Sequence, residues 1–165
     1  MAINAFVSFF DKADGESIVK GKEKWIEIQG WDWEVDAETS WTKGGGASVG
    51  KPNPGKMHFE HRFDTASPVI LGYICTGKAF PKCELQMMRP AGAGNLQTYF
   101  TMTLEGVFIT RVSNTGTADG NVAQIVEMVF KTVKIEYKSQ DSKGAMVPAK
   151  VFSWDIPAGT ASPSA

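Results

Sequence analysis

The stretch WIEIQGWDWEV, which runs from Trp25 to Val35, changes its hydrophobic pattern at its centre. Before Gly30 two isoleucines occupy even positions, and after Gly30 two tryptophans and a valine occupy odd positions. Because the side chains of a strand alternate between its two faces, this change at a glycine predicts one strand, from Trp25 to about Glu38, that bends or bulges. Strands of this kind allow a sheet to turn a corner, so the stretch favours a barrel or a sandwich.

The same change of parity occurs in two further stretches. Between residues 97 and 112 the apolar positions switch around Gly106, and between residues 122 and 138 they switch near Lys131 and Thr132. Three long strands that change faces predict a closed or nearly closed β structure. Shorter alternating segments predict strands near residues 3–11, 57–63, 83–87 and 152–156.

One segment is typical of a helix. Ser67 and Pro68 are residue types that begin helices, and Gly77 is the type that ends them. Between them the apolar residues share one face at helical spacing, and they are Ile70, Leu71, Ile74 and Cys75. The segment therefore predicts one short helix that packs on a sheet.

The segment from Trp41 to Lys56 has no periodicity and is rich in glycine and proline. It predicts a long loop, and long loops in compact domains are commonly functional. The residues GGASVGK at 45–51 have the spacing of a phosphate-binding loop. Pro52 follows where that motif needs a hydroxyl residue and the start of a helix, so we expect no nucleotide site.

The composition predicts one domain, residues 1–156, with a disordered tail at residues 157–165. The 165-residue chain is 42% hydrophobic and contains ten Phe and five Trp, which is enough for a large core. No core-forming residue follows Ile156. The net charge of −1 offers no basic field for nucleic acid or for an anionic membrane, and the run from Lys20 to Lys24 predicts a solvated loop.

The N-terminal residues contain neither a basic region nor an apolar run, which predicts no cleaved signal peptide and no membrane insertion. We therefore expect the chain to fold in the cytoplasm and to need a separate machine for export. Cys75 and Cys83 are too few and too far apart for a metal motif, and they predict two buried thiols.

The residue types that carry catalysis are not arranged for it. His58 and His61 have an odd spacing that points them to opposite faces of a strand, so they cannot share a metal; we expect His61 in a core or interface and His58 exposed. A nucleophilic triad therefore lacks its base. The carboxylates Asp32, Glu34 and Asp36 predict a polar outer face or one side of a charged subunit contact rather than a glycosidase pair. We expect no enzyme activity, no cofactor and no metal.

Several short motifs, taken in order, resemble those of the haemolysin-coregulated protein (Hcp) family, the tail-tube protein of bacterial type VI secretion. The resemblance covers the chain up to Ile156. Its motifs are Gly15-Glu16-Ser17, Trp25-Ile26-Glu27-Ile28 with Trp31-x-Trp33, Gly44–Gly46, Asp64-x-x-Ser67-Pro68, Gly77-x-x-Phe80-Pro81, Tyr137-x-x-Gln140-Asp141-x-x-Gly144 and Phe152-Ser153-Trp154.

The resemblance implies a two-sheet β-barrel or sandwich with one short α-helix, six copies of which close into a ring with a wide lumen. Rings would stack into a tube inside a contractile sheath and beneath a spike protein. Effector proteins would be held and stabilised in the lumen. The protein would leave the bacterial cytoplasm without a cleaved signal peptide when the tube is fired.

Two groups of residues are candidates for contacts in such an assembly. The long loop is the candidate for contact with a neighbouring subunit or ring, through Trp41, Gly44, Gly45, Gly46, Lys51, Asn53 and Lys56. The polar turn at residues 114–121 is the candidate for lining the lumen and touching cargo, through Asn114, Thr115, Thr117 and Asp119. An uninvolved mobile loop and an ordinary hairpin turn are the simpler alternatives.

Two other functions stay open at this point. A monomeric β-barrel could bind a small ligand such as a sugar on a concave face, without self-association. A tail-tube subunit of a phage-like particle would share the fold and the ring but not the secretion partners.

Overall fold

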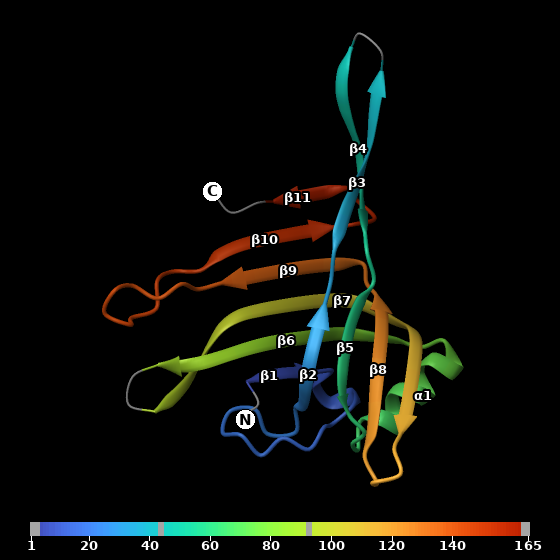
Figure 1. Ribbon diagram of the computed structural model, residues 1–165, viewed down its shortest axis with the longest axis vertical. Coiled ribbons are helices and arrows are strands. Elements are labelled where there is room, and N and C mark those ends of the chain that lie inside the picture. Colours follow the sequence, from blue (N-terminus) through green and yellow to red (C-terminus); the bar gives the residue numbers. More distant parts are fainter. Residues whose placement is uncertain (1–3, 43–44, 92–93, 163–165) are drawn as a thin grey trace.

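The computed structural model describes residues 4–42, 45–91 and 94–162 (Figure 1). These residues form one α-helix, α1 (Ser67–Thr76), and one 3-10 turn, η1 (Phe10–Lys12). All other regular structure in this part of the chain is β. The strands are β1 (Ala5–Ser8), β2 (Ile26–Asp32), β3 (Val35–Thr42), β4 (Gly46–Pro54), β5 (Met57–Arg62), β6 (Ala79–Ala91), β7 (Asn95–Gly116), β8 (Val122–Val129), β9 (Thr132–Tyr137), β10 (Lys150–Asp155) and β11 (Thr160–Ser162).

Six strands close into a barrel. The order β7-β6-β1-β2-β5-β8 is completed by direct pairing of β8 with β7. Three further strands, β9, β10 and β11, continue outward from the first half of β7 as a flap. The prediction of a mainly β barrel with one helix is therefore confirmed.

Gly106 allows β7 to serve both the flap and the barrel wall. Before it, residues 100–105 pair with β9, and after it, residues 108–116 pair with β8. Gly106 has φ +62°, and a Cβ there would lie 2.9 Å from Cδ of Lys131. Met102 and Val107 are both buried although they have opposite parity. The predicted change of face at Gly106 is therefore confirmed.

The predicted bent strand at residues 122–138 is two strands. The buried positions have the expected parity, with Met128 on β8 and Val133 on β9. The β structure is interrupted at Phe130 and Lys131, because β8 and β9 pair with different halves of β7. The corner is therefore too sharp for one continuous strand.

The stretch around Gly30 shows both the predicted bulge and an unpredicted break. The pairing of β2 with β5 shifts register between Ile28 and Gly30. The strand then ends at Asp32 and resumes as β3 at Val35. The bulge is confirmed, and the single strand from Trp25 to Glu38 is wrong.

The helix begins and ends almost as predicted. Gly77 has φ +67° and its N–H caps the last turn. The expected cap by Ser67 is wrong, because Asp64 Oδ1 instead accepts a 2.9 Å hydrogen bond from the N–H of Ala66. Tyr73 stacks on Phe80 of β6 with 3.8 Å between ring centroids, which attaches the helix to the sheet.

The core fills the barrel with side chains from all of its walls. Phe9 stacks on Phe80 at 4.1 Å and lies 6.3 Å from the ring of Phe59. Ile26, Ile28, Met57, Leu85, Met102, Leu104, Val126 and Met128 complete the centre of this cluster. Cys83 is buried, as predicted, and burial raises the pKa of its thiol above the usual range. Cys75 is exposed on α1, so the prediction of two buried thiols is wrong.

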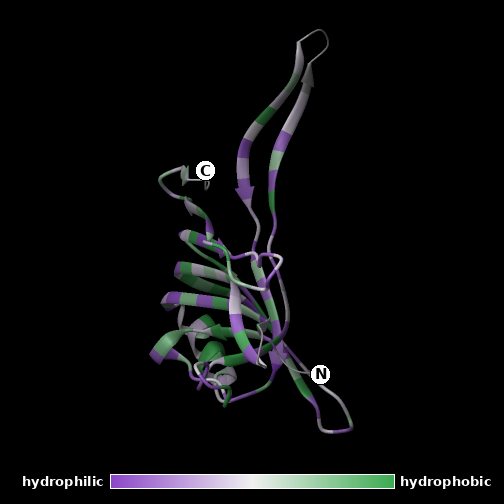
Figure 2. Cartoon of the chain, turned by 90° about the vertical axis from the view of Figure 1, so that its left-hand side faces the viewer, coloured by the Kyte–Doolittle hydropathy of each residue, from purple (hydrophilic) through white to green (hydrophobic). Residues whose placement is uncertain are grey.

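Strands β3 and β4 form a two-stranded hairpin, which we call the arm, residues 35–54. The arm stands clear of the barrel along the long axis of the molecule (Figures 1 and 2). The prediction of a loop here is wrong. Glycine and proline interrupt the alternation of apolar and polar residues on β4, and the pairing of the two strands comes from backbone hydrogen bonds that the sequence does not display.

Two other expectations about exposed segments need correction. Thr160–Ser162 pairs with β10 as β11, so the predicted disordered tail is wrong at these residues; residues 163–165 lie outside the described chain. Within the predicted solvated loop, Lys22 is buried with its ammonium 4.4 Å from the centroid of the Trp25 ring. Burial lowers the pKa of Lys22, and Glu84 opposes that shift. No helix in the described ranges is long and apolar enough to span a membrane.

Candidate assembly surfaces

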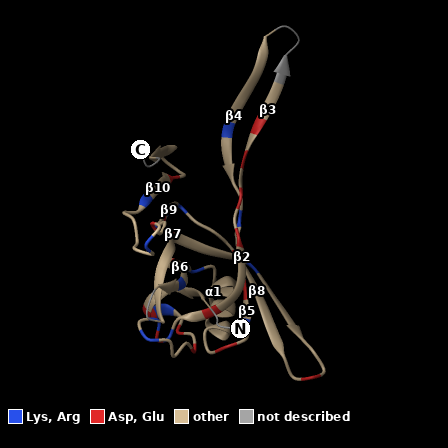
Figure 3. Ribbon diagram, turned by 60° about the vertical axis from the view of Figure 1, so that its left-hand side comes forward, with Lys and Arg blue, Asp and Glu red and all other residues tan. Residues whose placement is uncertain are grey.

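The arm has one apolar and one polar face. Cross-strand partners share a face, and one face carries the pairs Val35 with Pro54, Ala37 with Pro52 and Thr39 with Val49. The other face carries Asp36 with Asn53 and Ser40 with Ser48. Val49 is 72% exposed. Figure 3 shows acidic positions along β3 and a basic position on β4. The arm therefore presents an uncovered apolar face to its surroundings.

The root of the arm is held rigidly. The indole N–H of Trp33 donates to the carbonyl of Gly55 at 3.0 Å, and Gly55 N–H donates to the carbonyl of Glu34 at 2.8 Å. The Trp33 ring also packs 5.7 Å from the ring of Phe130. A Cβ on Gly55 would lie 2.7 Å from the Glu34 carbonyl oxygen, so only glycine fits between the two strands.

Four ionisable side chains connect the root of the arm to the barrel. Glu127 on β8 accepts from Lys56 Nζ at 2.9 Å and from His58 Nε2 at 2.9 Å. His58 Nδ1 lies 3.3 Å from Asp32 Oδ2. The hydrogen bond from Lys56 is the largest cause of the lowered pKa of Glu127, and His58 contributes in the same direction while burial opposes it. His58 is half-buried rather than exposed, because it lies between two carboxylates.

His61 lies on the opposite face of β5, in the core, as predicted. Its side chain is fully buried, and Nε2 donates to Gln124 Oε1 at 2.8 Å. Gln124 in turn donates to Asn114 Oδ1 at 2.9 Å. These contacts join β5, β8 and β7 at the lower end of the barrel wall.

Most of the predicted contact residues lie on the arm. Trp41 belongs to β3, Gly45 to its turn, and Gly46, Lys51 and Asn53 to β4. Gly44 lies outside the described residues. Lys56 follows the arm and already pairs with Glu127 inside the same chain.

The predicted lumen turn is the tip of the β7–β8 hairpin, at the end of the molecule opposite the arm (Figure 1). Asn114 and Thr115 are still in β7, while Thr117 and Asp119 are in the turn. The carboxylate of Asp119 accepts from Thr117 and from Asn121, and the Thr117 hydroxyl is the largest cause of the lowered pKa of Asp119. The turn is therefore ordered by its own side chains.

One sheet of the barrel has two open edges. Its strands run in the order β2-β5-β8-β7 and are all antiparallel. Among the described residues, β2 from Gly30 to Asp32 and β7 from Ile109 to Gly116 have a partner strand on one side alone. Sequence periodicity reports faces and not edges, so it gave no sign of this feature.

The fold and these surfaces define a small β-barrel protein of a structural class. Residues 6–139 match the family described as "Type VI secretion system effector, Hcp". The chain belongs to the Hcp family, which is structural and not enzymatic and whose members are exported by the type VI secretion system. The family that the sequence motifs resemble is therefore confirmed, as is the expectation that the protein is not an enzyme.

Similar proteins agree with this assignment. Protein hcp1 of Pseudomonas aeruginosa is 29% identical over 158 residues, which cover 94% of this chain and 96% of that protein. The crystal structure of Hcp1 from Salmonella typhimurium has a TM-score of 0.77 at 29% identity, covering 98% of this chain and all of that one. The structure of a type six secretion system protein has a TM-score of 0.88 at 24% identity and 98% coverage, and it supports the fold alone.

Proposed function

We propose that the protein is a structural subunit of the type VI secretion tail tube. Six copies form a ring, rings stack into a tube that is exported, and the lumen holds effector proteins and stabilises them. The observation that carries the ring is the sheet with two open edges in a member of the Hcp family. The number six, and the spike and sheath as further partners, rest on the family resemblance.

Backbone chemistry favours an edge-to-edge contact between copies. An open edge presents unpaired N–H and C=O groups that pair readily with another strand. Strands β2 and β7 run in opposite directions in the sheet, so the open edge of one copy can pair antiparallel with the other edge of the next. Such a head-to-tail contact generates a ring when its rotation closes.

The arm supports contact with another copy. A two-stranded hairpin is marginally stable by itself, and this arm leaves its apolar face uncovered. It extends from one end of the long axis, where a stacked ring or a neighbouring subunit could cover it (Figure 2). The proposed contact residues on the described part of the arm are Trp41, Gly45, Gly46, Lys51 and Asn53. Gly44 belongs to the same proposal but lies outside the described residues.

The β7–β8 turn is the proposed cargo contact, through Asn114, Thr115, Thr117 and Asp119. Its polar groups are exposed at one end of the sheet β2-β5-β8-β7. This is the sheet that would be joined edge to edge in the ring. A Thr117→Gln variant that still forms rings should retain less cargo than the native protein. Equal retention of co-expressed cargo would count against a lumen role for the turn.

Light scattering after size exclusion, followed by negative-stain imaging, tests the main proposal. A species near six times 17.9 kDa with a hollow centre is expected. A compact monomer over a wide range of protein and salt concentration would overturn the ring. That result would favour the monomeric ligand-binding barrel, and glycan binding would then be the next measurement.

A further inference from the structure

A row of ionisable residues crosses the sheet with two open edges. Asp32 on β2 is the register partner of His58 on β5, His58 is the partner of Glu127 on β8, and Glu127 is the partner of Arg111 on β7. The row thus reads acid, histidine, acid, base from one open edge to the other. Partners in adjacent strands lie close enough for their side chains to interact.

The interior members of the row are paired within the chain. His58 contacts both Glu127, at 2.9 Å, and Asp32, at 3.3 Å. The other oxygen of Glu127 is occupied by Lys56. Both oxygens of Glu127 are therefore engaged, and Glu127 and Arg111 make no ion pair in the described part of the chain.

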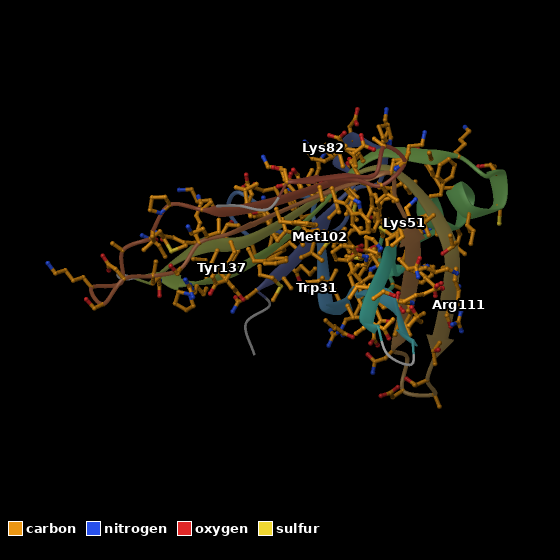
Figure 4. All side chains as sticks on the ribbon, turned by 90° about the horizontal axis from the view of Figure 1, so that it is seen from above. Trp31, Lys51, Lys82, Met102, Arg111 and Tyr137 are labelled. Atoms are coloured by element: carbon orange, nitrogen blue, oxygen red, sulfur yellow. The ribbon has the colours of Figure 1, made fainter. Side chains whose placement is uncertain are left out.

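The two ends of the row are incompletely paired. Arg111 is exposed, and its guanidinium makes no ion pair or hydrogen bond within the part of the chain that the structure describes. Asp32 is 75% exposed in its side chain and meets His58 through one oxygen. Arg111 and Trp31, the neighbour of Asp32, lie toward opposite edges of the sheet in Figure 4.

The edge beside Asp32 has room for a long side chain. Gly30 faces a hollow of about 460 Å³ whose lining includes Asp32, His58, Glu60 and Ile125. No atom lies within 4 Å of the position that a Cβ on Gly30 would take. A guanidinium entering this hollow would meet the carboxylates of Asp32 and Glu60, and its stem would meet the apolar surface of Ile125.

We propose that Arg111 of one copy pairs with Asp32 of the next copy, with its side chain in the hollow over Gly30. This inference rests on the proposed ring, in which the open β7 edge meets the open β2 edge. The contact joins the rows of successive copies into one continuous row of ionisable residues. The occupant of the hollow is therefore a second copy of this chain.

The contact between Arg111 and Asp32 favours one strand register, which backbone pairing alone does not. Edge strands can pair in more than one register, and a slip of one residue moves every side chain to the other face. An arginine that meets a carboxylate on the correct face penalises the slipped register, because both charges would then lose their partner. Asp32 and Arg111 thus select the register and the direction of the ring contact.

Charge reversal tests the pair. Arg111→Glu and Asp32→Arg should each raise the protein concentration needed for half-assembly by about tenfold or more, because like charges then meet across the contact. The double variant Arg111→Glu/Asp32→Arg should recover most of the loss. Arg62→Glu is the matched control, since Arg62 is exposed on β5, on the same face, but away from either open edge. Assembly is measured by light scattering, and circular dichroism checks that each variant is folded.

The outcomes separate this inference from the ring itself. Rings of Arg111→Glu that form at the native concentration would overturn the pair and leave the ring standing, as would failure of the double variant to recover. Absence of rings in the native protein would overturn the ring first. If Asp32→Arg disturbs His58, Arg111→Gln gives an independent measurement: it should weaken assembly less than Arg111→Glu, and an unchanged assembly would contradict the pair.

Discussion

The barrel and the arm are built from one continuous run of chain, yet they differ in what stabilises them. Strand β2 enters the barrel wall, and after two residues the chain leaves the barrel as β3. In the wall every second side chain is buried, as Ile26 and Ile28 show, whereas all described side chains of the arm are exposed. The barrel is therefore stabilised by its own core, while the arm needs another surface to cover it. A fold can thus contain a part that is complete only in the assembly.

Truncation of a core aromatic should show the largest effect on the free energy of unfolding. Phe59 is 1% exposed and packs on Phe9. Phe59→Ala should cost about 3–5 kcal/mol, from lost burial and from the cavity left behind. Val49→Ala on the arm should cost less than about 0.5 kcal/mol in the dissociated subunit. Urea unfolding measures both, and a comparable loss for Val49→Ala would contradict the division between barrel and arm.

The corner in β7 should be the next most sensitive position. Gly106→Ala places a side chain at φ +62° and against Lys131, so it should cost about 1–3 kcal/mol. Gly72 in α1 is a matched control, because it is exposed in a helix and a Cβ there meets nothing within 4 Å. Gly72→Ala should stabilise by about 0.5–1 kcal/mol. Thermal unfolding of the two variants should shift in opposite directions; shifts of the same sign would refute the role of the corner.

The charged root of the arm should make a smaller, pH-dependent contribution. Because the pKa of Glu127 is lowered in the folded protein, its stabilisation is present above the pKa of the unfolded carboxyl and is lost as pH falls through the folded pKa. Glu127→Gln should therefore cost on the order of 1 kcal/mol near neutral pH and less in acid. Unfolding free energies across this pH range measure the difference between the two proteins. Glu105→Gln is the control: it removes an exposed carboxylate of β7 that makes no side-chain hydrogen bond or ion pair among the described residues, and it should leave the unfolding free energy nearly unchanged.

Shortening the arm should have the smallest effect on the subunit and a large one on assembly. Replacement of residues 38–51 by a short glycine-rich turn leaves the root contacts of Trp33 and Gly55 in place. The unfolding free energy should change by less than about 1 kcal/mol, since none of the described side chains of the arm belongs to the core. Rings should persist in electron micrographs, and tubes should disappear. Unaltered tubes would remove the arm from the contact between rings.

The sequence predicted the parts of the fold where burial imposes a pattern. The parity changes at Gly30 and Gly106 located two real turning points, and Gly77 marked the end of the helix. The same reasoning failed on the arm, where no face is buried. It also failed at residues 130 and 131, where a break between two strands gives the same change of parity as a bend within one strand. Cys75 was misplaced because the helix covers the sheet with a narrower face than its apolar residues suggest.

The candidate site was only partly accessible to sequence reasoning. Most of the proposed contact residues fall in one segment, the arm, but their division between two faces of a hairpin depends on cross-strand register. The row from Asp32 to Arg111 joins residues from four strands spread over most of the chain. No local spacing relates them.

By itself the sequence determined the β architecture, the single helix and the family, because alternation, glycine positions and ordered motifs are local properties. The tertiary structure decided how the barrel closes, which edges stay open, where the arm projects and which charges meet. These are properties of register and direction between strands far apart in the chain. Backbone pairing is nearly independent of side-chain identity, so the choice among registers comes from packing and charge in the whole fold.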